Sequence, residues 1–264
     1  MAEKHYALVT GASKGIGKAI ATELARRGVN ILAVARSESL LSELCTSLKS
    51  EFKVDARYFP ADLLEEGMEV RMAKWVRDQK VPLNILVNNA GYGLWGRFAD
   101  MDLSDMRRML RLNNDSLIAL CHEFIPMLKE QPKAWIMNVG STAGYQAVPT
   151  MAAYSGSKAL VNTFTRALRF ELKKSPISVT LLSPGATESE FTTRAGMQAM
   201  QKTADKFNMT AEKVAKIGVR GMFRGKAEII PGFTNKITVW AARHLPKWLI
   251  ERMAANIYEK HLPK

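Results

Sequence analysis

The amino-acid sequence predicts an α/β fold in which a seven-stranded parallel sheet carries helices on both faces. Short apolar runs alternate along the chain with longer segments whose apolar residues recur at helical spacing. Strands that alternate with helices form parallel sheets buried on both faces. Because no linker, repeat or low-complexity segment breaks this alternation, we expect a single domain. Its main body would be residues 1–232, and residues 233–264 would be a helical extension of it.

The expected elements follow in a regular order. The strands are expected at residues 5–10, 30–35, 56–60, 83–88, 135–140, 177–182 and 227–231. The helices are expected at residues 14–28, 38–51, 66–79, 102–130 and 151–174, and a last one follows Pro246.

Composition limits the function only loosely. The 264 residues are 47% hydrophobic, enough for a sizeable core. The net charge of +13 permits attraction to nucleic acid, anionic lipid or an anionic cofactor, but the chain has no nucleic-acid-binding motif and we expect no such partner. Its two cysteines form no disulfide framework, and no uncharged apolar run reaches about 18 residues. With no secretory signal before the first strand, we expect a soluble, cytoplasmic protein without a metal site.

Three polar side chains near the middle of the chain indicate chemistry. Tyr154 and Lys158 are four residues apart in an expected helix and therefore lie on one face of it. A phenol titrates near pKa ~10 unless a nearby cation stabilises the phenolate, and Lys158 can supply that charge. Ser141 follows an expected strand, so its hydroxyl would lie at the carboxyl edge of the sheet, where open α/β folds hold ligands. The Tyr-x-x-x-Lys pair alone is a weak signal.

A glycine-rich turn follows the first strand and reads Thr10-Gly11-Ala-Ser13-Lys14-Gly15-Ile16-Gly17. Its backbone amides and the N-terminus of the next helix can hold a pyrophosphate. The spacing Gly-x-x-x-Gly-x-Gly differs from the widespread Gly-x-Gly-x-x-Gly pattern. Such a turn could also be only a tight connection, although its place after the first strand favours a dinucleotide.

Further motifs complete an ordered set. They are Asp62 after the third strand, Asn88-Asn89-Ala90-Gly91 after the fourth, Asn113 in the long helix, and Pro184-Gly185 after the sixth. With Ser141, Tyr154 and Lys158 they resemble the motif set of the short-chain dehydrogenases/reductases, over residues from about 5 to 191. Ser141 lies thirteen residues before Tyr154, the interval usual in that family. The resemblance implies the doubly wound, or Rossmann, form of the α/β fold.

The resemblance also implies an oxidoreductase that transfers a hydride between a nicotinamide cofactor and a carbonyl or alcohol. Tyr154 would be the general acid or base, and Ser141 would hydrogen-bond the substrate oxygen. Lys158 would lower the phenol pKa and hold the nicotinamide ribose, and Asn113 would support a water between Lys158 and solvent. The residues expected to bind the cofactor are Gly11, Ser13, Lys14, Gly15, Ile16, Gly17, Arg36, Ser37, Asp62, Leu63, Asn89, Ala90, Gly91, Tyr154, Lys158, Pro184, Gly185 and Thr187.

Some of these assignments have alternatives. Asp62 could instead be the N-cap of the next helix, and Ser189 could take the role of Thr187. Asn114, beside Asn113, leaves the register of that position open. Gly140 stands where many family members have a second Ser, which should not affect catalysis because Ser141 is retained.

The residues after the second strand favour NADP over NAD. Enzymes that prefer NAD usually place Asp or Glu there to bind the ribose 2′-hydroxyl, whereas this chain reads Arg36-Ser37. Lys14 in the glycine-rich turn adds a second cation, and Arg suits bidentate contact with a phosphate. We therefore predict a preference for NADPH of roughly tenfold or more.

The expected substrate is hydrophobic. The segments that would line its pocket are apolar through Tyr92, Leu94, Trp95, Phe191, Met197 and Met200. They favour a ketone, aldehyde or acyl substrate, although the same residues could pack a mobile lid. The alternative function is a non-catalytic dinucleotide-binding scaffold, and the retained cluster of Ser141, Tyr154 and Lys158 argues against it.

The end of the chain is basic and amphipathic. Residues 213–264 contain eleven Lys or Arg against three Glu. An apolar stripe is formed by Leu245, Trp248, Leu249, Met253 and Ile257. It could pack on the domain or a partner and cover the substrate cleft, or make peripheral contact with an anionic membrane.

The resemblance implies a homodimer or higher homo-oligomer, because the helices at 102–130 and 151–174 pair with their symmetry mates in that family. About thirty residues follow Gly232, where many family members end, which puts the familiar tetramer in doubt.

Overall fold

A seven-stranded parallel sheet forms the centre of the computed structural model, which describes residues 5–188 and 209–259. Its strand order is β3-β2-β1-β4-β5-β6-β9. The strands are β1 (Tyr6–Thr10), β2 (Asn30–Ala35), β3 (Ala56–Pro60), β4 (Leu83–Asn88), β5 (Ala134–Val139), β6 (Ile177–Leu182) and β9 (Glu228–Ile229). The order reverses between β1 and β4, which opens a crevice at their carboxyl ends where doubly wound folds bind ligands. The predicted fold class and all seven strands are confirmed.

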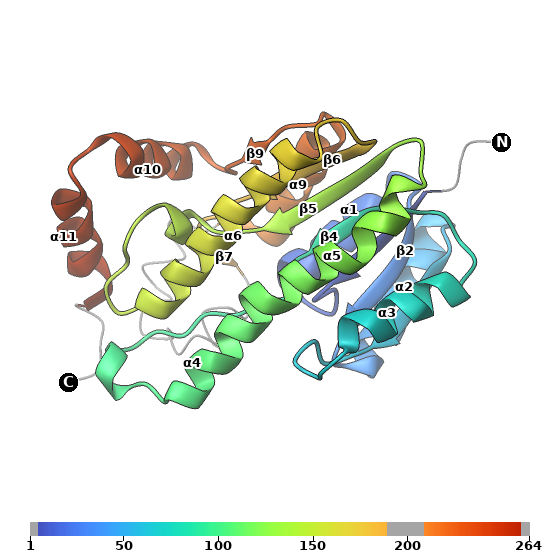
Figure 1. Ribbon diagram of the computed structural model, residues 1–264, viewed down its shortest axis with the longest axis horizontal. Helices are drawn as coiled ribbons and strands as arrows, with labels where there is room; N and C mark the ends of the chain where they lie inside the picture. Colours follow the sequence, from blue (N-terminus) through green and yellow to red (C-terminus); the bar gives the residue numbers. More distant parts are fainter. Residues whose placement is uncertain (1–4, 189–208, 260–264) are drawn as a thin grey trace.

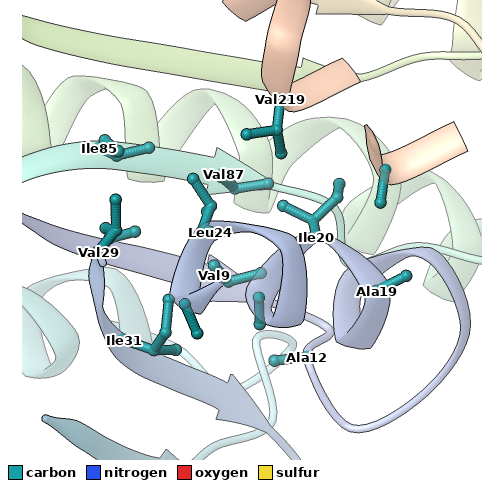
Figure 2. Packing of buried hydrophobic residues seen from close by; sticks show 14 of the residues in the cluster. Val9, Ala12, Ala19, Ile20, Leu24, Val29, Ile31, Ile85, Val87 and Val219 are labelled. Carbon is teal, nitrogen blue, oxygen red and sulfur yellow. The ribbon is translucent and has the colours of Figure 1, made fainter. Parts of the chain in front are cut away.

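Helices cover both faces of this sheet (Figure 1). One face carries α1 (Gly15–Ala25), α2 (Glu38–Phe52) and α9 (Ala211–Phe223). The other carries α3 (Met68–Asp78), α5 (Ser116–Lys129) and α6 (Ala152–Glu171). Figure 2 shows Ile20 and Leu24 of α1 close to Val9 of β1 and Val219 of α9, and all four are fully buried. Truncating one such Leu to Ala lowers the free energy of unfolding by about 2–5 kcal/mol, so this packing holds α1 firmly against the sheet.

The long helix expected at residues 102–130 is divided by an irregular turn. It consists of α4 (Leu103–Leu110), a π-helical segment η2 (Arg111–Asp115) and α5. Single π turns occur frequently at functional sites. The helix expected from residue 66 begins at Met68, because Gly67 has a positive φ of 69° and ends the preceding turn.

Several elements were absent from the sequence-based expectation. They are α9, α10 (Phe233–His244), the short strands β7 (Thr187–Glu188) and β8 (Met209–Thr210), and the 3₁₀ turns η1 (Phe98–Asp100) and η3 (Thr142–Tyr145). Helix α9 has a strong apolar face of its own, with Val214, Val219 and Met222 packed on the sheet.

The last two helices, α10 and α11 (Lys247–Tyr258), form what we call the C-terminal arm, residues 233–259. Figure 1 shows the arm at the end of the molecule toward which the strands point. Its buried side chains are Val239, Ile250 and Ala254. Most of the expected stripe is therefore exposed: Trp248, Met253 and Ile257 are half-exposed or more, whereas Leu249 is partly buried. The reason is rotational, since Ile250 and Ala254 occupy the side of α11 that meets the body.

Candidate active site

The expected site residues all gather at the carboxyl edge of the sheet. The turn between β1 and α1, with the start of α1, contains Gly11, Ser13, Lys14, Gly15, Ile16 and Gly17. The segments that follow the next strands contain the others: Arg36 and Ser37 after β2, Asp62 and Leu63 after β3, Asn89, Ala90 and Gly91 after β4, and Pro184, Gly185 and Thr187 after β6. Ser141 follows β5, and Tyr154 and Lys158 lie on the first turns of α6.

The glycine-rich turn is closely packed at the level of the backbone. A Cβ atom on Gly17 would collide with the carbonyl oxygen of Gly11 and the side-chain amide of Asn89. That amide donates hydrogen bonds to the carbonyl oxygens of Thr10 and Gly11 at 3.0 and 3.3 Å. The Thr10 hydroxyl accepts from the backbone N–H groups of Asn89 and Ala90 at 3.0 and 3.1 Å. These bonds join the turn after β1 to the loop after β4.

The same turn fits the phosphates of a dinucleotide. The first turn of α1 contains no acidic residue, so nothing opposes an anion at its N-terminus. Lys14 is exposed there, and Arg36 is exposed at the end of β2. Together they supply positive charge on the side where a ribose phosphate would lie.

Arg36 shares its surroundings with Asp62 and Tyr92. Burial raises the pKa of the Tyr92 phenol, the charge of Arg36 lowers it, and the charge of Asp62 raises it. Asp62 accepts a hydrogen bond from the backbone N–H of Leu64 at 3.1 Å, within its own turn. Because the N-cap of α3 is Gly67, Asp62 does not cap the next helix.

Ser141, Tyr154 and Lys158 lie together and are buried. Ser141 and Tyr154 share a hydrogen bond, and the Ser141 hydroxyl also accepts from the backbone N–H of Ala143 at 3.1 Å. The Lys158 ammonium donates to the carbonyl oxygen of Val139 at 3.0 Å, and its Nζ lies 6.0 Å from the centre of the Tyr154 ring. A hydroxyl, a phenol and an ammonium therefore meet beside the last residues of β5.

Burial shifts the pKa values of both titratable groups in this cluster. Burial raises the pKa of the Tyr154 phenol to about 12, although the hydrogen bond with Ser141 lowers it. Burial also lowers the pKa of Lys158 to about 8. Burial is the largest influence on the phenol, and the Lys158 ammonium donates its hydrogen bond to Val139, so the expected lowering of the phenol pKa by Lys158 stays a prediction. At neutral pH the phenol is protonated.

Asn113 lies in the π-helical segment and points toward the site. Its side-chain amide donates to the carbonyl oxygen of Tyr92 at 2.9 Å and to the Ser157 hydroxyl at 3.1 Å. Its side-chain oxygen accepts from the backbone N–H of Tyr92 at 3.1 Å. Asn114 instead donates to the carbonyl oxygen of Ser157 at 2.7 Å, on α6. The π turn thus lets two successive amides face the same way, and Asn113 is the one that holds the loop after β4.

Gly140 is explained by close packing. A Cβ atom there would collide with the side-chain oxygen of Asn162 and approach Leu181 to 2.9 Å. The second Ser of other sequences has no space in this chain. Asn162 also donates to the carbonyl oxygen of Ser141 at 3.3 Å, so the same side chain that excludes a residue larger than Gly140 positions Ser141.

Asn88 lies beneath the site. Its side chain donates to Asn138 at 2.9 Å and to the Cys121 sulfur at 3.2 Å, and all three residues are buried. Asn88 therefore anchors the start of the loop after β4 to the buried residues Asn138 and Cys121. Asn89 makes the contacts of this loop with the glycine-rich turn. Cys121 and Cys45 are both free and buried.

The loop after β6 meets the C-terminal arm. The Thr187 hydroxyl donates to the carbonyl oxygen of Gly185 at 3.1 Å. A Cβ atom on Gly185 would collide with Asn235 of α10, so the loop and the arm are in contact. Ser189, the alternative to Thr187, lies outside the described residues.

An apolar wall surrounds Tyr154. Tyr92, Leu94 and Trp95, which the sequence placed in the lining of the substrate pocket, pack around it. Met109, Val148 and Met151 pack with them. The other expected lining residues, Phe191, Met197 and Met200, lie outside the described residues. Tyr258 of α11 joins the wall, and its proximity raises the pKa of Tyr154.

Sequence reasoning missed two parts of this site. Tyr258 is separated from Tyr154 by about a hundred residues, and no spacing pattern links them. A second group, which we call the arm clamp, consists of Tyr145, Glu228 and Arg243. Glu228 accepts from the Tyr145 hydroxyl at 2.8 Å and from Arg243 at 2.8 and 2.9 Å. The only available signal was that Glu228 is one of just three acidic residues in a basic segment.

Comparisons with known proteins agree with this geometry. The family model for short chain dehydrogenases matches residues 5–200. The very-long-chain 3-oxoacyl-CoA reductase of Kluyveromyces lactis is 33% identical over 67% of this chain, which spans 53% of that protein. Hydroxysteroid dehydrogenase-like protein 1 of Gallus gallus is 31% identical over 92% of this chain and 73% of its own length.

Solved structures share the fold. A short-chain dehydrogenase from Sphingobium yanoikuyae, in complex with NADPH, is 27% identical, with a TM-score of 0.80 over 98% of this chain and 96% of that one. A short chain dehydrogenase/reductase from Burkholderia phymatum, in complex with NAD, has a TM-score of 0.84 over 90% and 92% of the two chains, at 20% identity. The match of the family model over most of the sequence, together with these relatives, shows that the chain belongs to the short-chain dehydrogenase family.

Proposed function

We propose that this protein is an oxidoreductase that uses NADP(H) to interconvert a hydrophobic carbonyl compound and its alcohol. The observation that carries the proposal is the buried meeting of Ser141, Tyr154 and Lys158 beside the glycine-rich turn. Burying polar and ionisable groups costs free energy, and such clusters occur most often at functional sites. A non-catalytic scaffold would not need this cluster.

The cofactor supplies the hydride when it is bound. The turn from Gly11 to Gly17 would hold its pyrophosphate, and Lys158 would hold the nicotinamide ribose. Arg36, Ser37 and Lys14 would bind the 2′-phosphate. Asn89, through its bonds to Thr10 and Gly11, keeps the turn in shape.

The substrate oxygen would lie between two hydroxyls. Ser141 would donate a hydrogen bond to that oxygen and stabilise the charge that develops on it. Tyr154 would donate its proton to the same oxygen during reduction. With a pKa of about 12, the phenol is protonated at neutral pH and therefore carries the proton that carbonyl reduction needs. Alcohol oxidation would need the phenolate, so its rate should rise with pH.

The substrate class follows from the wall around Tyr154. Its members are apolar or aromatic, and it includes Tyr258 from the C-terminal arm. A pocket of this kind favours a ketone, aldehyde or acyl carbonyl with a bulky apolar group. Contacts of the arm with Gly185 and Glu228 support our proposal that the arm belongs to the catalytic domain.

A substrate panel tests the proposed function. Purified protein is assayed by nicotinamide absorbance with aliphatic, aromatic and polycyclic ketones and alcohols, each with NADPH and NADH. We expect turnover with bulky apolar ketones, and higher efficiency with NADPH. Cofactor binding without turnover on any carbonyl or alcohol would instead support the scaffold function.

We also propose that the protein forms at least a homodimer through α4, α5 and α6. Exposed apolar residues support this surface: Leu103, Leu110, Ile118, Leu160 and Phe170. Two-fold homo-oligomers are the commonest assemblies. Light scattering at micromolar concentration should give at least twice the chain mass of 29.4 kDa, and a monomer would contradict the proposal.

A further inference from the structure

The C-terminal arm presents a row of large apolar side chains to solvent. On α10, Phe233, Ile237 and Trp240 are 77%, 50% and 58% exposed. Their spacing of four and three residues places them on one side of the helix. On α11, Trp248 and Met253 are 64% and 54% exposed. We call these five residues the docking face.

Packing against the body does not account for the docking face. The opposite side of the arm already makes that contact through Val239, Ile250 and Ala254, which are buried. Arg243 holds the arm to Glu228 with two hydrogen bonds. The exposed residues of the docking face are therefore not the ones that hold the arm to the domain.

Positive charge accompanies the docking face. Lys236 lies on α10 one turn from Phe233, and Lys247 precedes Trp248. Both lysines are exposed. Between Glu228 and Glu251 the sequence contains no acidic residue, so α10 and the start of α11 carry cations only.

We propose that the docking face binds an anionic lipid surface, with the arm lying in the plane of the membrane interface. Tryptophan and aliphatic side chains beside lysines are the usual composition of helices that bind in this way. A second copy of this chain is a poorer partner, because a two-fold contact would bring the same lysines together. No helix in the described ranges is both long and apolar enough to cross a bilayer, so the arm lies on the surface.

Vesicle binding tests the proposal on the full chain without any assay of turnover. Protein is sedimented with phosphatidylcholine vesicles that contain about a third phosphatidylglycerol, and with vesicles of phosphatidylcholine alone. We expect at least tenfold stronger binding to the anionic vesicles at low salt, and a clear loss at high salt. Equal binding to both vesicles, or none, would overturn the proposal.

Variants locate the contact. The double variant Trp240→Ser, Trp248→Ser should bind anionic vesicles at least tenfold more weakly, and Lys236→Glu, Lys247→Glu should lose the salt-sensitive part. Val70→Ser is the control, because Val70 is 49% exposed on α3, outside the docking face and the surface proposed for the dimer, and should not affect binding. Thermal unfolding should be unchanged in every variant, since the altered residues are exposed.

Two results would overturn the assignment of the docking face. One is a Val70→Ser variant that loses as much vesicle binding as the tryptophan variant. The other is light scattering in which only the tryptophan variant loses a subunit, which would make the docking face a contact between copies of this chain.

Discussion

The glycine-rich turn and the C-terminal arm both lie at the carboxyl edge of the sheet, yet they are held in opposite ways. The turn is fixed by hydrogen bonds from the Asn89 side-chain amide to the carbonyl oxygens of Thr10 and Gly11, and it has no space for a side chain at Gly17. The arm has three buried side chains and one charged anchor, Arg243. We infer that the turn sets the cofactor chemistry, whereas the arm can vary and adjusts what reaches the site.

The largest expected effect tests the chemistry beside the turn. Tyr154→Phe should lower turnover at least 100-fold, because it removes the proton donor and keeps the ring, and general acids typically contribute about 10²–10⁴-fold. The dissociation constant of the cofactor should stay within about twofold, since the apolar wall still holds the ring. Stopped-flow turnover and fluorescence titration measure the two quantities on the same sample.

Two observations decide whether Tyr154 acts in this way. More than about a tenth of wild-type turnover in the variant would remove Tyr154 from the mechanism. In the wild type, alcohol oxidation should rise with pH well above neutrality, because the phenol pKa is about 12. An oxidation rate that is flat from pH 7 to pH 10 would exclude the phenolate as the base.

The sequence predicted the glycine-rich turn better than the C-terminal arm, because the turn is closely packed and the arm is not. In the glycine-rich turn and in the loop after β4, close contacts admit few residue types. Gly11, Gly17 and Asn89 can therefore be recognised as site residues from their identity and order in the sequence. The helix after Pro246 was predicted, but which side of α11 faces the body was not, because Ile250 and Trp248 are both apolar. Burial there depends on the rest of the fold rather than on local pattern.

Side-chain electrostatics were also beyond the sequence. The Tyr-x-x-x-Lys spacing placed Tyr154 and Lys158 on one face of α6 correctly. It could not show that the ammonium binds Val139 or that burial dominates both pKa values. The π turn at Asn113 was missed for a similar reason, since it is stabilised by contacts with Tyr92 and Ser157 from other segments.

An intermediate effect tests the charge that surrounds the turn. Arg36→Ala should lower kcat/KM with NADPH roughly tenfold, about 1.4 kcal/mol, and change the value with NADH less than twofold. The control Arg220→Ala removes the same charge from an exposed position on α9 and should change neither value. Equal losses with both cofactors would mean that Arg36 does not contact a 2′-phosphate.

The smallest expected effect concerns the arm clamp. Arg243→Ala removes the two hydrogen bonds to Glu228, while Tyr145 still binds that carboxylate at 2.8 Å. A half-exposed ion pair contributes about 0.2–1 kcal/mol, so the arm should loosen without unfolding. We expect a rise of about twofold to fivefold in KM for a bulky ketone, because Tyr258 would be held less firmly against Tyr154. The value of kcat and the cofactor affinity should not change.

Comparison with two further variants makes the clamp effect specific. Arg252→Ala, which removes an exposed cation from α11, should leave KM unchanged in lipid-free assays. If the clamp acts through Tyr258, then adding Arg243→Ala to a Tyr258→Ala variant should raise KM no further, because the side chain that the clamp positions is already gone. Additive effects of the two substitutions would show that Arg243 acts on the substrate by another route.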